Sequence, residues 1–191
     1  GAPITQSCQF NSTMIVTDGY ATVNNPTTPP GNADGSGTWT TQYGNTNTFP
    51  YRDIASDTLA DIAMKYYRDN PRTDLTVGKV PVNPQDTGPD ADRNPNLHMN
   101  TYAMGLGVKG TIFGTGSAAA ANPYASPGPD WSLVNGYPDR SPKSVDDLWH
   151  ATLNGRGDMV SASDPVSVQT AIQSIVANVL AKVGAAAAVA V

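Results

Sequence analysis

Three short apolar segments alternate along this chain with three segments of helical periodicity, and this alternation most constrains the fold. In chain order the six segments are residues 13–17, 57–69, 100–108, 145–154, 158–162 and 164–183. Short apolar runs bounded by turn residues indicate buried strands. Strands that alternate with helices predict a mainly parallel sheet flanked by helices and joined by right-handed crossovers. The expected fold class is therefore a three-layer α/β fold.

The ends of the predicted helices carry recognisable capping residues. Ser56 or Asp57 is placed to cap the first helix, and Ser144 is placed to cap the second. Gly155 follows the last turn of the second helix, where glycine commonly stops helices. Asp164–Pro165 predicts the start of the third helix, with aspartate as the cap and proline at the first helical position.

Apolar side chains recur at helical spacing, which predicts the faces that pack on the sheet. On the first two helices the predicted stripes are Leu59, Ile62, Ala63, Tyr66 and Tyr67, and Val145, Leu148, Trp149, Thr152 and Leu153. On the third helix the residues at helical spacing are Val168, Ile172, Ile175, Val176, Val179 and Val183. In the loops, Trp39 and Trp131 remain as candidates for exposed contact residues.

Long polar stretches separate the predicted elements. Residues 21–50, 80–97 and 114–142 are rich in Asn, Thr, Pro and Gly, and we expect long loops or insertions there. A length of 191 residues suits one domain. Because three strands make a thin sheet, residues 1–191 are expected to be either a single domain whose loops add strands or the C-terminal part of a larger domain.

Composition excludes two classes of partner. Charged residues are 14% of the chain and the net charge is −5, so no basic surface is available to neutralise the phosphates of nucleic acid. No apolar run reaches the roughly 20 residues that a spanning helix needs, and we expect no membrane insertion.

The chain has a single cysteine, Cys8. It is expected to be either a free thiol or a buried small side chain.

Two sets of motifs resemble known families. The run from Met14 to Gly19, an apolar strand that ends in Thr-Asp-Gly, resembles the fourth-strand signature of von Willebrand A domains. Residues 56–67, 98–108 and 145–157, together with Cys8, resemble in the same order the N-terminal module of the type IV pilus assembly and tip adhesin family PilY (PilC-like).

The resemblance implies a von Willebrand A-like, non-enzymatic surface module for type IV pilus biogenesis and adhesion. It implies export through the periplasm to an extracellular or cell-surface location. The implied partners are pilins or minor pilins and a host or abiotic surface ligand. It also implies that Cys8 pairs with a cysteine N-terminal to these residues or is free. The Asp-x-Ser-x-Ser segment of a metal-dependent adhesion site is not found here on a first strand.

Asp18 is the candidate metal ligand. A carboxylate at the carboxyl end of a strand can supply one of the oxygens that Mg²⁺ or Ca²⁺ requires, and by resemblance Asp18 matches an adhesion-site aspartate. With one ligand present, the site is expected to be incomplete. The alternative is that Asp18 only begins a turn with Gly19.

A second oxygen-rich motif is Asp90-x-Asp92-x-Asn94. It has the spacing of a calcium loop but lacks the glycine and the final carboxylate of such a loop, and it is expected to be a solvated loop.

An enzymatic alternative remains open. A hydrolase-type α/β enzyme would place its site at the carboxyl ends of the strands, near Asp18 and His98. Such a site requires the two side chains within hydrogen-bond reach of each other. The other histidine, His150, follows Trp149 on a helix and is expected to serve in packing or capping.

Overall fold

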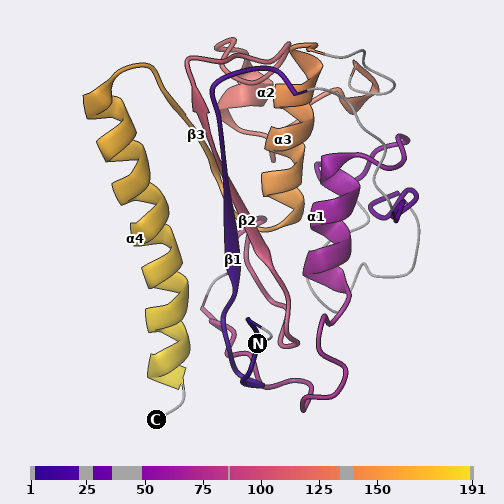
Figure 1. Ribbon diagram of the computed structural model, residues 1–191, viewed down its shortest axis with the longest axis vertical. Coiled ribbons are helices and arrows are strands. Elements are labelled where there is room, and N and C mark those ends of the chain that lie inside the picture. The colour runs from indigo at the N-terminus through magenta and orange to yellow at the C-terminus, as the bar shows by residue number, and fades with distance from the viewer. Residues whose placement is uncertain (1–2, 22–27, 36–48, 86, 134–139, 190–191) are drawn as a thin grey trace.

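The computed structural model describes residues 3–21, 28–35, 49–85, 87–133 and 140–189, with side chains to residue 184. Its strands and helices are β1 (Ser12–Thr17), α1 (Leu59–Arg68), β2 (Asn100–Leu106), α2 (Ala118–Ala121), the 3₁₀ turn η1 (Trp131–Leu133), α3 (Lys143–Asn154), β3 (Met159–Ala162) and α4 (Pro165–Val189). The strands form a parallel sheet in the order β1-β2-β3. Helices α1 and α3 lie on one face of this sheet and α4 lies on the other (Figure 1). The predicted α/β class with a parallel sheet between helices is confirmed.

The start of α1 is one or two residues later than the capping prediction. Thr58, and neither Ser56 nor Asp57, is the N-cap: its hydroxyl accepts from the N–H of Asp61, whose carboxylate in turn accepts from the N–H of Thr58. This reciprocal pair is a capping box. Asp57 has a φ of 63°, a left-handed conformation that no helix can include.

Helix α3 begins two residues before the prediction, and Ser144 lies inside its first turn. The Ser144 hydroxyl donates to the carbonyl of Ser141 and accepts from the N–H of Ala21. It therefore ties the segment after β1 to α3 and does not cap the helix. The predicted ends were right at Asn154 and at the start of α4, where Asp164 accepts from the N–H groups of Val166 and Ser167.

The main core lies between the sheet and the pair α1 and α3. Its buried members from the elements are Met64, Tyr67, Ala103, Val145, Leu148, Trp149, Leu153 and Met159, and its loop members include Tyr51, Ile112 and Trp131. Two predictions were wrong here. Tyr66 is 53% exposed because Met64 takes the inward position, and Trp131 is 4% exposed, so it is no surface contact residue. Trp39 lies outside the described residues.

The first strand is more exposed than its apolar sequence predicted. Within the described part of the chain β1 lies at an edge of the sheet, paired with β2 alone. Met14 and Val16 are 45% and 47% exposed, whereas β2 is buried along almost its whole length. The apolar sequence of β1 predicted a buried strand. This prediction was wrong because β1 is an outer strand of the sheet.

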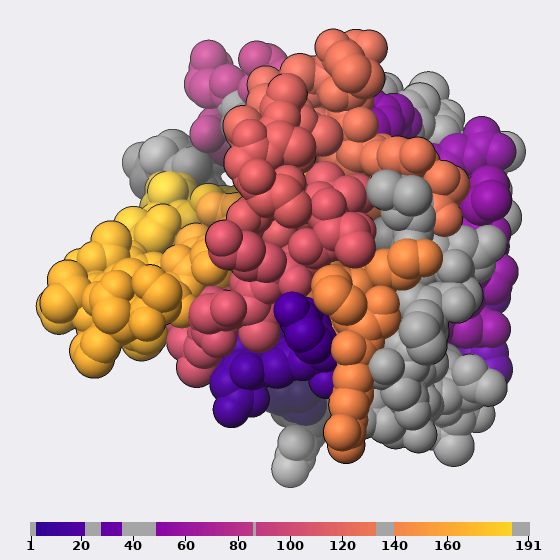
Figure 2. Space-filling model, turned by 90° about the horizontal axis from the view of Figure 1, so that it is seen from above, coloured from indigo at the N-terminus to yellow at the C-terminus, as the bar shows by residue number. Residues whose placement is uncertain are grey.

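Helix α4 packs on the sheet through a narrow stripe. Ala171 and Ile175 are buried, and Ala171 packs with Met104 of β2 and Ala162 of β3. Ile172, Val176 and Leu180 are exposed. Seen from above, α4 stands out from one side of the molecule (Figure 2). Residues 165–184 are long and apolar enough for a membrane span by length and composition, with a mean hydropathy of 1.2. The expectation that no segment meets this criterion is therefore wrong, although the buried core helix of a folded domain can meet it as well.

Candidate functional site

The carboxyl ends of the three strands lie together at one end of the sheet, which we call the carboxyl edge. The sequence predicted a binding site there. The register pairs Thr17 with Gly105 and Leu106 with Ala162. Asp18 therefore follows β1 at this edge, and the residues after it are exposed in the view from above (Figure 2). Three residues beyond Asp18, the chain bonds to the first turn of α3 through Ala21.

Thr17, rather than Asp18, makes the local turn bonds at this edge. Its hydroxyl accepts from the N–H of Gly19 and donates to the carbonyl of the same residue. The Asp18 side chain is exposed and has no hydrogen bond or ion pair within the described part of the chain. Nor does Asp18 join any group of three converging carboxylate, histidine or cysteine ligands among the described residues. Its carboxylate is thus available to an external ligand.

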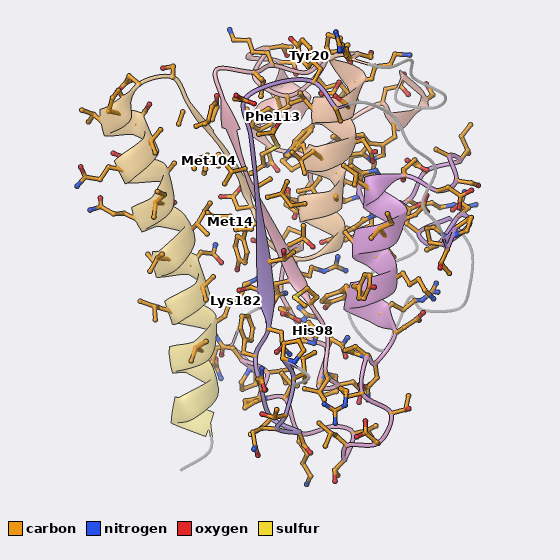
Figure 3. All side chains as sticks on the ribbon, viewed as in Figure 1. Met14, Tyr20, His98, Met104, Phe113 and Lys182 are labelled. Atoms are coloured by element: carbon orange, nitrogen blue, oxygen red, sulfur yellow. The ribbon has the colours of Figure 1, made fainter. Side chains whose placement is uncertain are left out.

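His98 lies at the opposite end of the sheet from Asp18. It precedes the first residue of β2, Asn100, which pairs with Ser12 at the beginning of β1. With about 3.3 Å per residue along parallel strands, the two side chains are separated by more than ~20 Å. Figure 3 shows Tyr20, a close neighbour of Asp18 in sequence, at the top of the molecule and His98 in its lower half. The hydrolase alternative, which needed Asp18 and His98 within hydrogen-bond reach, is therefore wrong.

His98 instead belongs to a buried network with Asp92. Its Nε2 lies 2.9 Å from Asp92 Oδ2 and its Nδ1 lies 2.7 Å from the carbonyl oxygen of Asn96. Asp92 also accepts from the Tyr67 hydroxyl and from the amide of Asn100. Although burial favours the neutral acid, His98 holds the pKa of Asp92 well below its usual range.

This network corrects the expectation of a solvated loop around residues 90–96. Asp92 and Asn94 each accept from the N–H two residues later, and Asn94 is fully buried. The alternate spacing that resembled a calcium loop therefore serves successive side-chain turns. Because both oxygens of Asp92 have internal donors, this carboxylate is not available for a cation.

A second group of candidate ligands lies in the core: Asp34, Asp53 and His150. His150, on α3, is fully buried and stacks on Trp131, with ring centroids 4.1 Å apart. Its Nδ1 lies 3.4 Å from Asp53 Oδ2 and its Nε2 lies 3.7 Å from Asp34 Oδ2. These three side chains could hold a metal ion.

The electrostatics of this group favour a positive charge between the carboxylates. Burial, partly opposed by the charge of His150, raises the pKa of Asp34 to about 7. Although burial favours neutral imidazole, the Asp53 carboxylate facing Nδ1 and the charges of both carboxylates raise the pKa of His150. Neither His150 Nδ1 nor Asp53 Oδ2 has a hydrogen-bond partner within the described part of the chain, and a shared proton or a metal ion between them would satisfy both atoms. A mixed nitrogen and oxygen set in a closed site is typical of structural transition-metal binding.

Sequence reasoning missed this group because its members come from three distant segments. Asp34 and Asp53 lie in or just after the stretch predicted as a long loop, where acidic residues are usually solvated. Both are buried here, and Asp34 accepts from the N–H of Asp53 and from the amide of Asn154. Only contacts across the tertiary fold bring them to His150, and no spacing in the sequence signals such contacts.

The elements and site define the class of this protein as an α/β domain with a parallel sheet between helices and an exposed acidic residue at the carboxyl edge.

Comparison with known proteins gives relatives among full-length sequences. No family model and no solved structure matches the chain. It is 30% identical over 191 residues to the type IV pilus biogenesis factor PilY1 of Pseudomonas aeruginosa strain PAK. The PilY1 proteins of strains PAO1 and UCBPP-PA14 are 29% identical over 197 residues and 30% identical over 199 residues. These alignments cover 92% of this chain and 16% of the length of those relatives.

Proposed function

We propose that this chain is a non-enzymatic module of von Willebrand A type that acts in type IV pilus biogenesis and surface adhesion. The observation that carries the proposal is the similarity to PilY1 along 92% of the chain. Under this proposal the module is exported through the periplasm and works at the cell surface in association with pili. Pilins or minor pilins and a host or abiotic surface ligand are its proposed partners.

The state of the two histidines supports a role without catalysis. A general base must have a ring nitrogen free to take a proton from a bound substrate. Both ring nitrogens of His98 are engaged, by Asp92 and by the backbone of Asn96. His150 is fully buried between Trp131 and the two carboxylates of the core group. Each histidine thus serves the packing of the fold.

The carboxyl edge of the sheet is the proposed contact surface. Asp18 is exposed there, and rigid elements present the loops that follow them, as is common for binding sites on α/β scaffolds. We propose that Asp18 supplies one oxygen to a Mg²⁺ or Ca²⁺ ion whose other ligands come from outside residues 1–191 or from the bound partner. The bound cation would then join the module to an acidic or oxygen-rich surface.

Cosedimentation with pili tests this proposal. The purified chain is mixed with type IV pili sheared from the organism that encodes it, either in roughly 5 mM Mg²⁺, an excess over a millimolar site, or in EDTA. We expect the chain to pellet with the pili in Mg²⁺, and Asp18→Ala to reduce the pelleted fraction about tenfold, equivalent to one lost charge-assisted contact.

The matched control is Asp74→Ala, which removes another exposed loop carboxylate, one that is paired with Arg72. This variant should pellet like the unmodified chain. If the chain remains in the supernatant under every condition, the pilus partner is refuted. If Asp18→Ala and Asp74→Ala pellet equally well, the assignment of the contact to the Asp18 edge is refuted.

A further inference from the structure

Two buried pairs of a histidine and an aspartate differ in their geometry. His98 Nε2 lies 2.9 Å from Asp92 Oδ2 and forms a hydrogen bond with it. His150 Nδ1 lies 3.4 Å from Asp53 Oδ2, yet neither atom has a hydrogen-bond partner within the described part of the chain. A separation of 3.4 Å without a hydrogen bond means that the oxygen lies off the line of the ring N–H. The first pair is therefore complete, whereas the second pair lacks a group between its two atoms.

The other ring nitrogen of His150 is already engaged. Nε2 lies 2.9 Å from the carbonyl oxygen of Tyr51, which can only accept, so a neutral ring carries its proton on Nε2. Nδ1 then presents a lone pair to the carboxylate of Asp53, and two buried acceptors that face each other are unfavourable. A histidine that donates one ring N–H to a backbone carbonyl and offers its other nitrogen has the usual arrangement of a metal ligand.

The two carboxylates beside His150 are held in place by other donors. Asp53 accepts from the N–H of Ala55 through Oδ1, and its Oδ2 is the atom without a partner. Asp34 accepts from the N–H of Asp53 through Oδ1 and from the amide of Asn154 through Oδ2. Each carboxylate oxygen has a second lone pair, so these bonds leave capacity for a cation. Hydrogen bonds of this kind orient carboxylates that bind metal ions.

The distances and charges of this group fit a divalent ion. Asp34, Asp53 and His150 each offer one ligand atom, and these atoms lie within 4.8 Å of one another. Ligands at about 2.0–2.1 Å from a tetrahedral ion are about 3.3 Å apart, which matches the 3.4 Å between His150 Nδ1 and Asp53 Oδ2. The three side chains are at most 2% exposed, and among the described residues His150 is the only ion-pair partner of either carboxylate. A divalent ion would balance the two buried negative charges.

Asn154 borders the group and is a candidate for a fourth ligand. Its Nδ2 donates to Asp34 Oδ2 at 2.9 Å and to the carbonyl oxygen of Ala60 at 3.0 Å. Its Oδ1 is buried and has no hydrogen-bond partner within the described part of the chain. Structural zinc sites are closed and four-coordinate, and they take nitrogen and oxygen ligands.

We propose that Asp34, Asp53 and His150 form a structural Zn²⁺ site, with His150 bound through Nδ1 and Asp53 through Oδ2. The ion joins α3, which carries His150, to the two segments before α1 that carry the aspartates. It is bound as the chain folds, because buried ligands from three distant segments meet only in the folded state. This site is separate from the proposed contact surface at Asp18 and does not depend on the proposed role in pili.

Refolding with and without zinc tests this proposal. The purified chain is unfolded in urea with EDTA, transferred to urea without EDTA, and refolded with equimolar Zn²⁺, with equimolar Mg²⁺ or without metal. After gel filtration we expect about one Zn²⁺ per chain and no retained Mg²⁺. The zinc-loaded chain should unfold at a temperature at least about 5 °C higher than the metal-free chain. A chain that retains no zinc, or whose unfolding temperature is the same with and without zinc, overturns the proposal.

X-ray absorption of the zinc-loaded chain identifies the ligands. We expect nitrogen and oxygen neighbours at about 2.0–2.2 Å, including an imidazole, and no sulfur. Cys8 is exposed and could bind zinc adventitiously, which a sulfur neighbour at about 2.3 Å would reveal. Cys8→Ser should therefore keep the zinc content and the rise in unfolding temperature. A sulfur neighbour, or loss of zinc in Cys8→Ser, contradicts the assignment to the core group.

Asp53→Asn removes a ligand charge and keeps an oxygen for the N–H of Ala55. It should lower the zinc affinity at least about tenfold in competition with a chelator. His98→Gln is the matched control, because His98 is the other buried histidine beside a carboxylate, and it should bind zinc like the unmodified chain. If either variant fails to fold, the zinc content and the absorption spectrum of the unmodified chain decide the matter. Unchanged zinc affinity in Asp53→Asn would overturn the proposed site.

Discussion

The carboxylate of Asp147 in α3 caps the amino end of α1, 88 residues away in sequence, accepting from the backbone N–H groups of Leu59 and Ala60, each at 3.0 Å. These N–H groups belong to the first turn of α1 and have no partner within the helix. The adjacent Asp146 uses its carboxylate in the same way on the N–H groups of Thr111, Ile112 and Phe113. Two consecutive acids of α3 therefore fix one helix and one loop against it.

Asp147→Ala should lower the free energy of unfolding by about 1–3 kcal/mol, because it leaves two N–H donors of a buried helix end without an acceptor. Urea unfolding measures the loss. Asp69→Ala is the control, since Asp69 is 40% exposed at the other end of α1 and pairs with Lys65 on the surface. We expect it to cost less than about 1 kcal/mol. Equal losses for the two variants would contradict the capping role of Asp147.

Leu148→Ala should cost about 2–5 kcal/mol of stability, because Leu148 is 4% exposed in the core between α3 and the sheet. The chain offers a matched control in Leu180, which is also a helical leucine but is 62% exposed on α4. Leu180→Ala should change stability by less than about 0.5 kcal/mol. Thermal unfolding compares the two. An unchanged midpoint for Leu148→Ala would show that α3 does not pack on the sheet as described.

The stability of the metal-free protein should fall as pH rises from about 4 to about 7. Burial, partly opposed by His150, raises the pKa of Asp34 from 3.8 to about 7, so the folded protein holds a proton that the unfolded chain releases in this interval. Linkage then lowers the free energy of unfolding with increasing pH, by at most about 4 kcal/mol for this group. The raised pKa of His150 acts in the same direction.

Asp34→Asn should flatten this pH dependence. Urea unfolding in EDTA at about pH 4, 5, 6, 7 and 8 measures it, because these values cover the interval between the unfolded and folded pKa of Asp34. Asp74→Asn is the control, because Asp74 is hydrogen-bonded to Arg72 and its pKa is lowered to about 2, below the interval. This control should keep the slope of the unmodified protein. A slope that is unchanged in Asp34→Asn would show that Asp34 is not the titrating group.

Cys8 should react with a thiol reagent in native buffer, because its side chain is exposed and forms no disulfide here. The alternative expectation of a buried side chain is thereby corrected. If the full-length protein has a cysteine N-terminal to these residues, we expect Cys8 either to pair with it in an oxidising compartment or to remain free. Mass spectrometry of that protein without reductant measures the pairing. An unmodified Cys8 thiol in the exported protein would remove the argument for a disulfide.

Local signals predicted the elements of this fold well, and long-range contacts account for most of the differences. Asp164–Pro165 marked the start of α4 correctly because a cap and a helix-initiating proline act within four residues. Periodicity could not decide between Tyr66 and Met64, because the inward face of α1 depends on where α3 packs. The exposure of Met14 and Val16 likewise depends on which strands lie beside β1. The sequence of β1 alone does not determine that order.

The functional residues were harder to predict than the fold. Asp18 follows an apolar strand directly, so the local sequence was sufficient to place it at the carboxyl edge. The register of β1 and β2 separates His98 from it, and that register is a property of the paired strands. Asp34 and Asp53 became visible as candidates only through burial and their distance to His150, which depend on the folded chain.

The central claim, a role in pilus biogenesis, is tested most directly by exchanging the matched segment of PilY1 in P. aeruginosa for residues 1–191 and counting surface pili. Exchange strains with unmodified residues should retain pili at a level of the same order as the parent. A strain that carries Leu148→Asp, which buries a charge in the core of the module, should lose them. Immunoblots confirm equal amounts of exported protein in the strains that are compared. We predict surface pili in the unmodified exchange strain and their loss with Leu148→Asp. An unmodified exchange strain that exports the protein yet makes no pili would contradict the claim.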